Sequence, residues 1–395
     1  MNKRLYILIY LNKQWLPCGL LEYHEDGQRS SSIFRYGKKY LLHKDAISID
    51  PVQLPLEDHS FETPAGFSIF NGIRDAGPDK WGRYLLDKKL SQALSEIDYI
   101  TETSADRAGA LAFTESLDTN TTHIPPPKRL NLIQCAGAIE DIAASEDSDR
   151  LKHYLDYGPS LGGVRPKATV VWKNKLCLAK FSLSLDSKNE PRIEYATMTL
   201  AKKCGLNVPP LYLEEINQRS VFLIERFDRA EDVPIPFISG LTITGTHESD
   251  YASWSYLSLA DAIIKFSENP EKDLKELFHR LIFNIAVYNN DDHLRNFGFL
   301  GSEKHWNLSP LYDVSPAVIH TNTYTLAMTL GTEGRQASYK NALSLCERFR
   351  ITKKKAFQIV REIQDTTSKW KKHFKDIGVS KSEITMLENS FKSKG

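Results

Sequence analysis

The stretch Asn289-Asn-Asp-Asp-His-Leu-Arg-Asn-Phe297 decides how this sequence is interpreted, because it concentrates acids, amides and bases in one short segment. It follows an apolar, helix-like run over residues 277–288 and precedes a segment typical of a strand. Phosphoryl transfer needs a carboxylate near the attacking hydroxyl and an oxygen ligand for Mg²⁺ on the same loop. Asp291 and Asn296 stand at the five-residue spacing of such catalytic loops.

Other interpretations of this segment stay open at the level of sequence. Asp292 is an alternative base, and Arg295 is suited to neutralising phosphate or nearby carboxylates. A polar turn between a helix and a strand also favours Asn and Asp without any catalytic role. A metallohydrolase that uses Asp291, Asp292, His293 and Asp313 as a hard-metal cluster is a rival hypothesis.

A second acidic residue follows closely, in Leu308-Ser-Pro-Leu-Tyr-Asp-Val314. Asp313 is placed as a second metal ligand after a catalytic loop would be. The structural alternative is an aspartate that caps a turn before Pro316. The position of Asp313, shortly after Asp291 in the chain, favours the metal-binding interpretation.

Two upstream segments carry features suited to binding phosphate. Gly158-Pro-Ser-Leu-Gly-Gly-Val-Arg-Pro-Lys167 combines adjacent glycines with two cations, although it lacks the ending of a Walker A motif. Lys180 lies near the end of the apolar run Leu178-Ala-Lys-Phe181, and Glu194 opens the next predicted helix as its candidate partner. A structural glycine turn and a solvent-facing edge lysine are the alternatives.

Periodicity and turn signals predict the remaining elements. Strands are expected over residues 5–11, 15–23, 34–41, 46–49 and 221–225, and a hairpin over 168–172 and 176–181. Helices are expected over residues 130–144, 194–204 and 277–288, and another opens at Asp75-Ala-Gly-Pro-Asp79. Residues 116–127 are polar and proline-rich, which is typical of a linker.

Composition excludes several classes of protein. The formal net charge is +1, so the chain as a whole is no basic coat for nucleic acid. The five cysteines are scattered and form no CxxC pair, which favours a reducing cytoplasm. The apolar runs are too short to span a bilayer. The first residues are interpreted as a strand rather than a signal peptide.

These segments, taken in order, resemble the HipA family, the kinase toxins of bacterial type II toxin–antitoxin systems. The resemblance covers nearly the whole chain. It includes Asp75-Ala-Gly-Pro-Asp-Lys-Trp-Gly-Arg83, Asp106-Arg-Ala-Gly-Ala-Leu111, Glu225-Arg-Phe-Asp-Arg229, the 289–297 stretch and Ser309-Pro-Leu-Tyr-Asp313. It implies an α+β protein with a small β-rich N-terminal subdomain (residues 1–120). A bilobal protein-kinase-like fold would follow, with an N-lobe-like region (121–230) and a mainly helical C-terminal lobe (231–395).

The resemblance also implies a role for each matching residue. The catalytic residues would be Asp291 as base, Asn296 and Asp313, and the last two would bind Mg²⁺. The residues that would contact ATP are Gly162, Gly163, Val164, Arg165, Pro166, Lys167, Lys180, Glu194, Glu225, Arg226, Phe227, His293, Arg295 and Tyr312. Ser160 matches the family's autophosphorylated serine, and its phosphate would expel the phosphate loop and inactivate the kinase.

The implied partners are a small helix-turn-helix antitoxin of the HipB type and, through it, operator DNA. The implied substrate belongs to the translation machinery, with aminoacyl-tRNA synthetases favoured. Residues 231–251 depart from the family pattern, in a region suited to contacts with substrate or partner. A catalytically silent, kinase-shaped scaffold that binds antitoxin and DNA is the second rival. The basic run Lys353-Lys-Lys355 fits a solvated helix face as well as a DNA patch.

Overall fold

The computed structural model describes residues 2–27, 29–92, 94–103, 106–117, 131–144, 165–183, 186–319 and 324–392. The chain falls into two compact units. The first comprises residues 1–183, 225–247 and 299–305, and the second comprises residues 184–224, 248–298 and 306–395. The predicted domain boundaries near residues 120 and 230 stay predictions.

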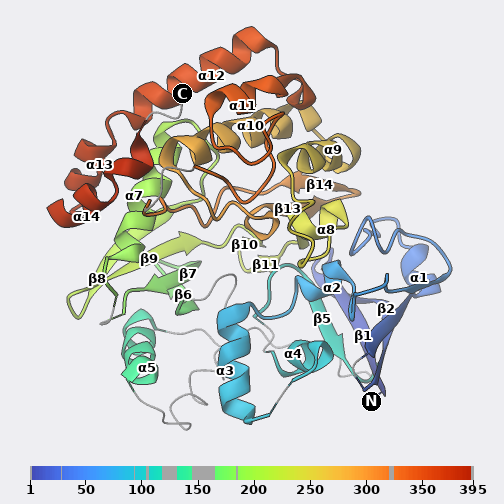
Figure 1. Cartoon of the computed structure of the whole chain (residues 1–395). Coiled ribbons are helices and arrows are strands. Elements are labelled where there is room, and N and C mark those ends of the chain that lie inside the picture. The colour runs from blue at the N-terminus through green and yellow to red at the C-terminus, as the bar shows by residue number, and fades with distance from the viewer. Residues whose placement is uncertain are drawn as a thin grey trace. The chain divides into compact units, whose positions relative to one another are not determined.

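The first unit begins with an antiparallel sheet of five strands in the order β4-β3-β2-β1-β5 (Figure 1). These strands are β1 (Asn2–Leu11), β2 (Gln14–Asp26), β3 (Arg29–Tyr36), β4 (Ser60–Glu62) and β5 (Leu111–Thr114). Leu5, Ile7 and Ile9 of β1 alternate along the strand and are buried, as the period of a half-buried strand requires. The strands predicted over residues 5–11 and 15–23 are therefore confirmed.

The strand predictions over residues 34–41 and 46–49 are partly wrong. β3 ends at Tyr36, and a short helix, α1 (Lys38–Leu41), follows it. Residues 46–49 form no strand, because tyrosine hydroxyls rather than a neighbouring strand bind their backbone. Tyr40 Oη contacts both N and O of Ile47, at 3.1 and 2.7 Å, and Tyr36 Oη accepts the N–H of Ile49 at 3.1 Å. Apolar residues buried in this way satisfy their polar groups without joining a sheet.

The rest of the first unit contains helices, two hairpins and a further strand. The helices are α2 (Asn71–Arg74), α3 (Lys80–Leu90), α4 (Glu96–Glu102), α5 (Leu132–Ala144) and α8 (Gly240–Thr244). The strands are β6 (Lys167–Trp172), β7 (Lys175–Phe181), β10 (Arg229–Ala230), β11 (Val233–Pro234) and β12 (Phe237–Ser239). Asp79 is the N-cap of α3 and accepts the N–H of Gly82 at 2.7 Å. The helix predicted over residues 130–144 is confirmed as α5, and the hairpin predicted over residues 168–172 and 176–181 is confirmed as β6–β7.

The second unit is mainly helical. Its larger elements are α7 (Glu190–Lys203), α9 (Tyr256–Phe266), α10 (Pro270–Val287), α11 (Tyr339–Ser344), α12 (Lys353–Thr367), α13 (Trp370–Asp376) and α14 (Lys381–Met386). Three 3₁₀ turns join them, η1 (Leu294–Asn296), η2 (Cys346–Phe349) and η3 (Glu388–Phe391). The hairpin β8 (Leu211–Ile216) and β9 (Arg219–Glu225) follows α7. Strands β13 (Gly298–Ser302) and β14 (His305–Leu308) follow η1, and residues 299–305 of this hairpin belong to the first unit.

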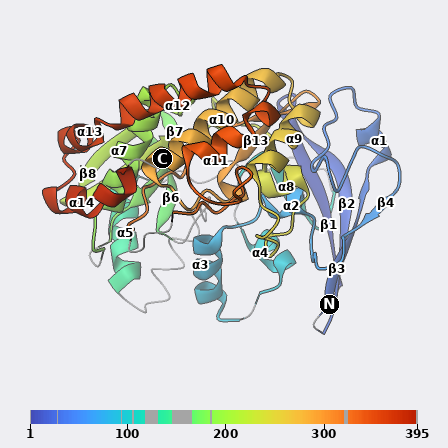
Figure 2. The same cartoon turned by 45° about the horizontal axis from the view of Figure 1, so that its top comes forward.

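Helix α10 forms the centre of the second unit, and it packs against α9 and α12 (Figures 1 and 2). Nearly all of its second half is buried, from Leu281 to Val287. Strands and helices together confirm the α+β prediction with a mainly helical C-terminal region.

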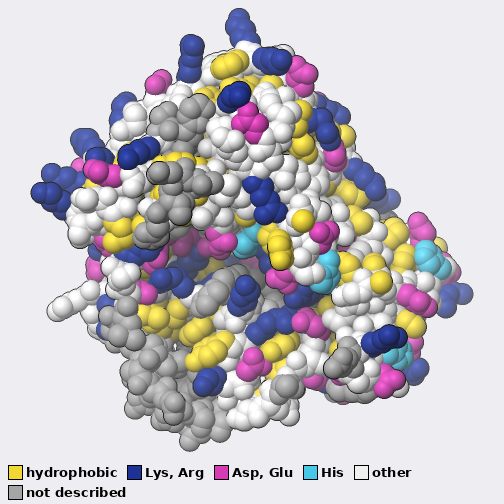
Figure 3. Space-filling model, viewed as in Figure 1, with side chains coloured by type: hydrophobic (Ala, Val, Ile, Leu, Met, Phe, Trp, Pro, Cys, Tyr) yellow, Lys and Arg dark blue, Asp and Glu magenta, His cyan; other side chains and the backbone are white. Residues whose placement is uncertain are grey.

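The surface gives two further findings. Among the residues described, no helix combines the length and apolarity needed to cross a bilayer. Figure 3 shows Lys and Arg side chains projecting over α12 and α13. Lys353 and Lys354 at the start of α12 are exposed, which agrees with a solvated helix face.

Candidate active site

The acidic loop begins where α10 ends. Asn269 caps the start of α10 by accepting the N–H of Lys272, and Pro270 occupies its first turn. Tyr288 ends the helix in the left-handed conformation, with φ of 54°. The N–H of Asn289 then returns to the carbonyl oxygen of Asn284 at 2.9 Å, which turns the chain sharply out of the helix.

Asp291 is the exposed carboxylate of this loop, with 77% of its side chain accessible. Its Oδ1 lies 3.5 Å from Nε2 of His293. Its backbone oxygen accepts a hydrogen bond of 2.8 Å from Nδ2 of Asn296, which is 8% exposed. Because the amide nitrogen of Asn296 is used in this way, its Oδ1 is the atom with lone pairs to offer a cation. The structure thus brings Asp291, His293 and Asn296 together.

Asp292, by contrast, is 1% exposed. Its two oxygens accept hydrogen bonds of 2.6 Å from the hydroxyl of Tyr256 and from the N–H of Ala327. Burial raises the pKa of Asp292 from 3.8 to about 7, against the effect of these hydrogen bonds. Asp292 was the alternative base at the level of sequence, but a carboxylate enclosed in this way has no access to a substrate hydroxyl.

The segment that carries Asp313 runs beside the loop. The N–H of Ser309 binds the carbonyl oxygen of Gly298 at 2.9 Å, and Tyr312 Oη donates to the carbonyl oxygen of Arg295 at 2.8 Å. Asp313 comes next and adopts a left-handed conformation, with φ of 57°. Such a conformation is uncommon for aspartate and is found where the surroundings impose it, often at functional sites.

Arg295 and His293 contact a second segment, residues 248–254. Glu248 binds Arg295 through two hydrogen bonds of 3.1 Å each. The ring of Trp254 lies edge-on to that of His293, with centroids 6.2 Å apart. Nδ1 of His293 is buried and has no hydrogen-bond partner within the described chain. Arg295 was predicted to contact ATP; in the structure its guanidinium is bound to Glu248.

The metallohydrolase hypothesis finds no support in these contacts. It requires Asp291, Asp292, His293 and Asp313 to converge on one cation, but both oxygens of Asp292 are bound elsewhere. No group of three or more His, Cys, Asp or Glu side chains suited to a metal occurs among the residues that the structure describes.

In the first unit, the predicted phosphate-binding lysines lie opposite each other. Lys167 of β6 and Lys180 of β7 are cross-strand partners, so their side chains share one face of the hairpin. Lys167 is 3% exposed, and its Nζ lies 3.2 Å from Oδ2 of Asp79. Two lysines in this arrangement repel each other, and an anion between them would relieve that repulsion. Asp79 supplies one negative charge.

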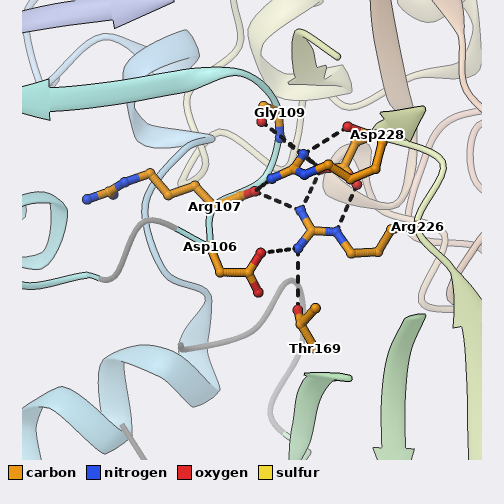
Figure 4. Close-up of polar contacts among 7 residues, drawn as sticks. Asp106, Arg107, Gly109, Thr169, Arg226 and Asp228 are labelled. Atoms are coloured by element: carbon orange, nitrogen blue, oxygen red, sulfur yellow. Dashed lines mark hydrogen bonds and ion pairs between the residues drawn. The ribbon is translucent and has the colours of Figure 1, made fainter. Parts of the chain in front are cut away.

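Arg226 is enclosed by the first unit, as Figure 4 shows. Its guanidinium donates to Asp106, to both oxygens of Asp228, to the carbonyl oxygen of Arg107 and to Oγ1 of Thr169. The side chain is therefore committed to the protein interior. A contact of Arg226 with nucleotide would fall to its carbonyl oxygen, because its backbone N–H donates to the carbonyl oxygen of Leu176.

The positive and negative side chains of the cluster around Arg226 balance each other in charge. Burial works to raise the pKa of Asp228, but the charges of Arg226 and Arg229 hold it well below its usual value. Asp228 also accepts the N–H of Gly109 at 2.9 Å. The cluster joins the Asp106–Gly109 region to the exit of β9.

The structure describes only some of the other residues that were predicted to contact ATP. Arg165 is exposed and Pro166 is buried, while Glu225 and Phe227 flank Arg226 where β9 ends. Ser160, Gly162, Gly163 and Val164 lie outside the described residues. Lys180 belongs to the first unit and the buried Glu194 to the second, so their pairing stays a prediction.

Sequence reasoning did not anticipate three residues that hold the loop: Tyr256, Asn284 and Glu248. Asn284 did give a signal, as an amide inside the apolar run Leu281-Ile-Phe-Asn-Ile-Ala-Val287. A buried amide of this kind needs a partner. Tyr256 lies 36 residues from Asp292 and Glu248 lies 47 residues from Arg295, and no local pattern marks either residue.

Comparison with known proteins adds to this geometry. Residues 159–370 match the family model of the HipA-like C-terminal domain, which is more than half of the chain. A Haemophilus influenzae protein named "Putative kinase" is 29% identical over 207 residues, which make up 46% of this chain and 60% of that protein. A Sinorhizobium fredii protein named "Putative kinase Y4mE" is 29% identical over 150 residues, or 35% of each chain.

These curated relatives are thus matched over less than two thirds of their own length. Among solved structures, the chain is similar to one titled as the Shewanella oneidensis toxin–antitoxin complex of HipA, HipB and operator DNA. The TM-score is 0.71 at 17% identity, and the match covers 98% of this chain and 95% of that one. At this identity the similarity concerns the fold.

Proposed function

Because the chain belongs to the HipA family, we propose that it is an ATP- and Mg²⁺-dependent serine/threonine protein kinase. One observation carries the proposal. Asp291 is exposed, and its backbone oxygen binds the side chain of Asn296. The hydroxyl of Tyr312, the residue before Asp313, binds the same loop. A carboxylate, an amide oxygen and a second carboxylate in this order are the groups that phosphoryl transfer needs.

In this mechanism Asp291 accepts the proton of the attacking serine or threonine hydroxyl. The hydroxyl oxygen forms a bond to the γ-phosphorus of ATP as the bond to the β-phosphate oxygen breaks, which leaves ADP. Lys180 and Lys167 balance the charge of the phosphates from one face of the β6–β7 hairpin. Glu194, the backbone of residues 225–227 and His293 complete the proposed contacts with nucleotide, together with the phosphate loop (Gly162, Gly163, Val164, Arg165 and Pro166).

Asn296 and Asp313 are the residues that would hold Mg²⁺. Their donor atoms fit this ion, which prefers amide and carboxylate oxygens. When bound, Mg²⁺ neutralises charge on the phosphates of ATP. The contact between Asn296 Nδ2 and the Asp291 carbonyl fixes which atom of the amide faces a cation.

We further propose a biological role as the toxin of a type II toxin–antitoxin system in the bacterial cytoplasm. The fold that the chain shares with a HipA from such a complex supports this role. A HipB-like antitoxin, operator DNA bound through it, and a translation protein such as an aminoacyl-tRNA synthetase as substrate are parts of the proposal. Autophosphorylation of Ser160 would switch the kinase off, because its phosphate adds negative charge within the loop that binds ATP.

The rival function is a silent scaffold that binds antitoxin and DNA without turnover. The Arg295–Glu248 pair is the observation that favours it, because it engages a guanidinium that would otherwise be available to phosphate.

Intact mass after incubation with ATP and Mg²⁺ separates these functions. Protein shown to start unphosphorylated should gain one phosphate, and Asp291→Asn should gain none because the base is lost. Asp365→Asn changes an exposed carboxylate on α12 and serves as the matched control, which should behave as the wild type.

The other outcomes are equally informative. Absence of any gain in the wild type would contradict the kinase and leave the scaffold. A phosphate that persists in Ser160→Ala but not in Asp291→Asn would keep the kinase and reject the proposed switch.

A further inference from the structure

The loop that carries Asp291 is attached to the protein interior on both sides of that residue. Asn290 and Asp291 are exposed, whereas Asn289 before them and Asp292 after them are buried. Within the loop, Asp291 contacts His293 and Asn296. The position of Asp291 therefore depends on how firmly its neighbours are held.

A chain of hydrogen bonds holds these neighbours. It runs from Ala327 N to Asp292 Oδ1 (2.6 Å), from Tyr256 Oη to Asp292 Oδ2 (2.6 Å), from Asn284 Nδ2 to Tyr256 Oη (2.9 Å) and from Asn289 Nδ2 to Asn284 Oδ1 (3.2 Å). Every side chain in it is at most 3% exposed. The chain links α9, α10 and the segment around Ala327 to both flanks of the exposed pair.

We propose that Asp292 is a positioning residue, which fixes the catalytic Asp291 by anchoring the loop to Tyr256 and Ala327. The inference rests on the proposed kinase function, and it extends that function by assigning a role to the second aspartate of the pair. Tyr256 and Asn284 act through the same chain. None of the three touches substrate.

The chemistry of the chain explains why position 292 carries a carboxylate. Asp292 faces two donors, a hydroxyl and a backbone N–H, and an ionised carboxylate is acceptor-only. Asparagine offers one acceptor oxygen and an NH₂ group. With its oxygen on Ala327, its NH₂ would face Tyr256 Oη, which already accepts from Asn284. The phenolic proton would then lack an acceptor in a buried site, which is costly.

Above its raised pKa of about 7 the carboxyl of Asp292 is ionised, and its charge then strengthens this anchor. Hydrogen bonds to an ionised carboxylate are roughly twice as strong as those between neutral groups. Burial also excludes the water that would otherwise compete for the same atoms. Asp292→Asn should therefore weaken both attachments while it leaves the volume of the side chain unchanged.

The test compares Asp292→Asn, Tyr256→Phe and their combination by the rate at which the full chain takes up phosphate from MgATP. In Asp292→Asn the maximal rate should fall roughly 10²-fold while the ATP concentration at half-maximal rate stays within about twofold, because Asp291 is displaced and the nucleotide contacts are kept. Tyr256→Phe should lose less, since Ala327 still holds the loop. The double variant should lose less than the two single losses combined, because both act through one chain.

Asp50→Asn is the matched control, since Asp50 is a fully buried aspartate of the other unit that accepts only backbone N–H groups. It should lower stability and leave the maximal rate unchanged. Hydrogen exchange of the amides of residues 289–296 gives a readout that needs no activity. It should be faster in Asp292→Asn and unchanged in Asp50→Asn.

Two results would overturn the inference. One is a maximal rate and a local exchange rate that do not change in Asp292→Asn. The other is a lower maximal rate together with a changed ATP concentration at half-maximal rate and faster hydrogen exchange throughout the chain. That combination marks a merely structural residue. If the wild type takes up no phosphate, the kinase proposal fails, and hydrogen exchange still decides whether Asp292 anchors the loop.

Discussion

Two adjacent aspartates of one loop have opposite surroundings. Asp291 is 77% exposed, and Asp292 is 1% exposed. The difference arises from the donors that the fold brings to the second position, namely the hydroxyl of Tyr256 and the N–H of Ala327. At the residue scale, the same side chain is thus suited to proton transfer in one place and to holding the backbone in the next.

The buried state of Asp292 predicts how stability depends on pH. Its pKa is raised from 3.8 to about 7 by burial, with Tyr256 and Asp291 as its polar neighbours. Between about pH 4 and about pH 7, Asp292 therefore keeps its proton in the folded chain but has released it in the unfolded chain. The stabilisation from this carboxyl is complete below about pH 4 and is lost as the pH rises through about 7.

Urea denaturation of the wild type and of Asp292→Asn across this range measures the effect. The difference in free energy of unfolding, wild type minus variant, should fall with rising pH and level off above about 7. Asp50, whose pKa burial raises from 3.8 to about 6, provides the comparison, because the same curve for Asp50→Asn should level off earlier. A difference that stays constant with pH would contradict a raised pKa for Asp292.

At the scale of elements, several hairpins turn in the same way. Four hairpins of the described chain turn through two residues that both have positive φ, which are Asn12 and Lys13, Lys173 and Asn174, Asn217 and Gln218, and Glu231 and Asp232. This left-handed turn matches the twist of the strands and is favoured by Asn and Gly. None of the four contains glycine, so each carries some backbone strain.

Gln218→Gly should therefore stabilise the β8–β9 hairpin. Gln218 has φ of 64°, a conformation that glycine adopts freely. The expected gain in free energy of unfolding is up to about 1 kcal/mol, since relief of strain is partly offset by the greater freedom of glycine in the unfolded chain. Chemical denaturation checks it. Gln218→Ala keeps the strain and should give no gain; equal effects of Gly and Ala would refute the explanation.

At the scale of the whole molecule, the residues proposed for catalysis and for ATP binding come from segments far apart in sequence. Lys180 lies in the first unit, and Asp291, Asn296 and Asp313 lie in the second. The cluster around Arg226 ties residues 106–109 to the end of β9 within the first unit. The residues of the proposed kinase therefore belong to both units.

Ligand binding should therefore register as stability of the whole chain. A ligand that binds only the folded state at 100 times its Kd adds about 2.7 kcal/mol, so MgATP should raise the unfolding temperature. Asp313→Asn and Lys180→Met should each reduce this increase, and removal of Mg²⁺ with a chelator should do the same. Thermal unfolding with each component alone is the control. An equal increase in both variants would contradict their proposed contacts.

Much of the fold follows from local pattern. The strands over residues 5–11 and 15–23, the β6–β7 hairpin and the helices α5, α7 and α10 were predictable from alternation, turn residues and helical periodicity. Residues 46–49 were not, because tyrosine hydroxyls from elsewhere bind their backbone. In the candidate site, spacing alone pointed to Asp291 and Asn296, and these two are in contact through the Asp291 carbonyl.

The sequence by itself determined the α+β class, the order of its elements and the short loop in which acids and amides gather, because these depend on neighbours in the chain. Only the tertiary structure decided which aspartate faces solvent, that Arg226 is enclosed and that Glu248 binds Arg295. Each of those outcomes depends on partners distant in sequence, such as Tyr256 for Asp292 and Asp106 for Arg226. Burial and hydrogen bonding at such range are set by how the elements pack, which local patterns do not encode.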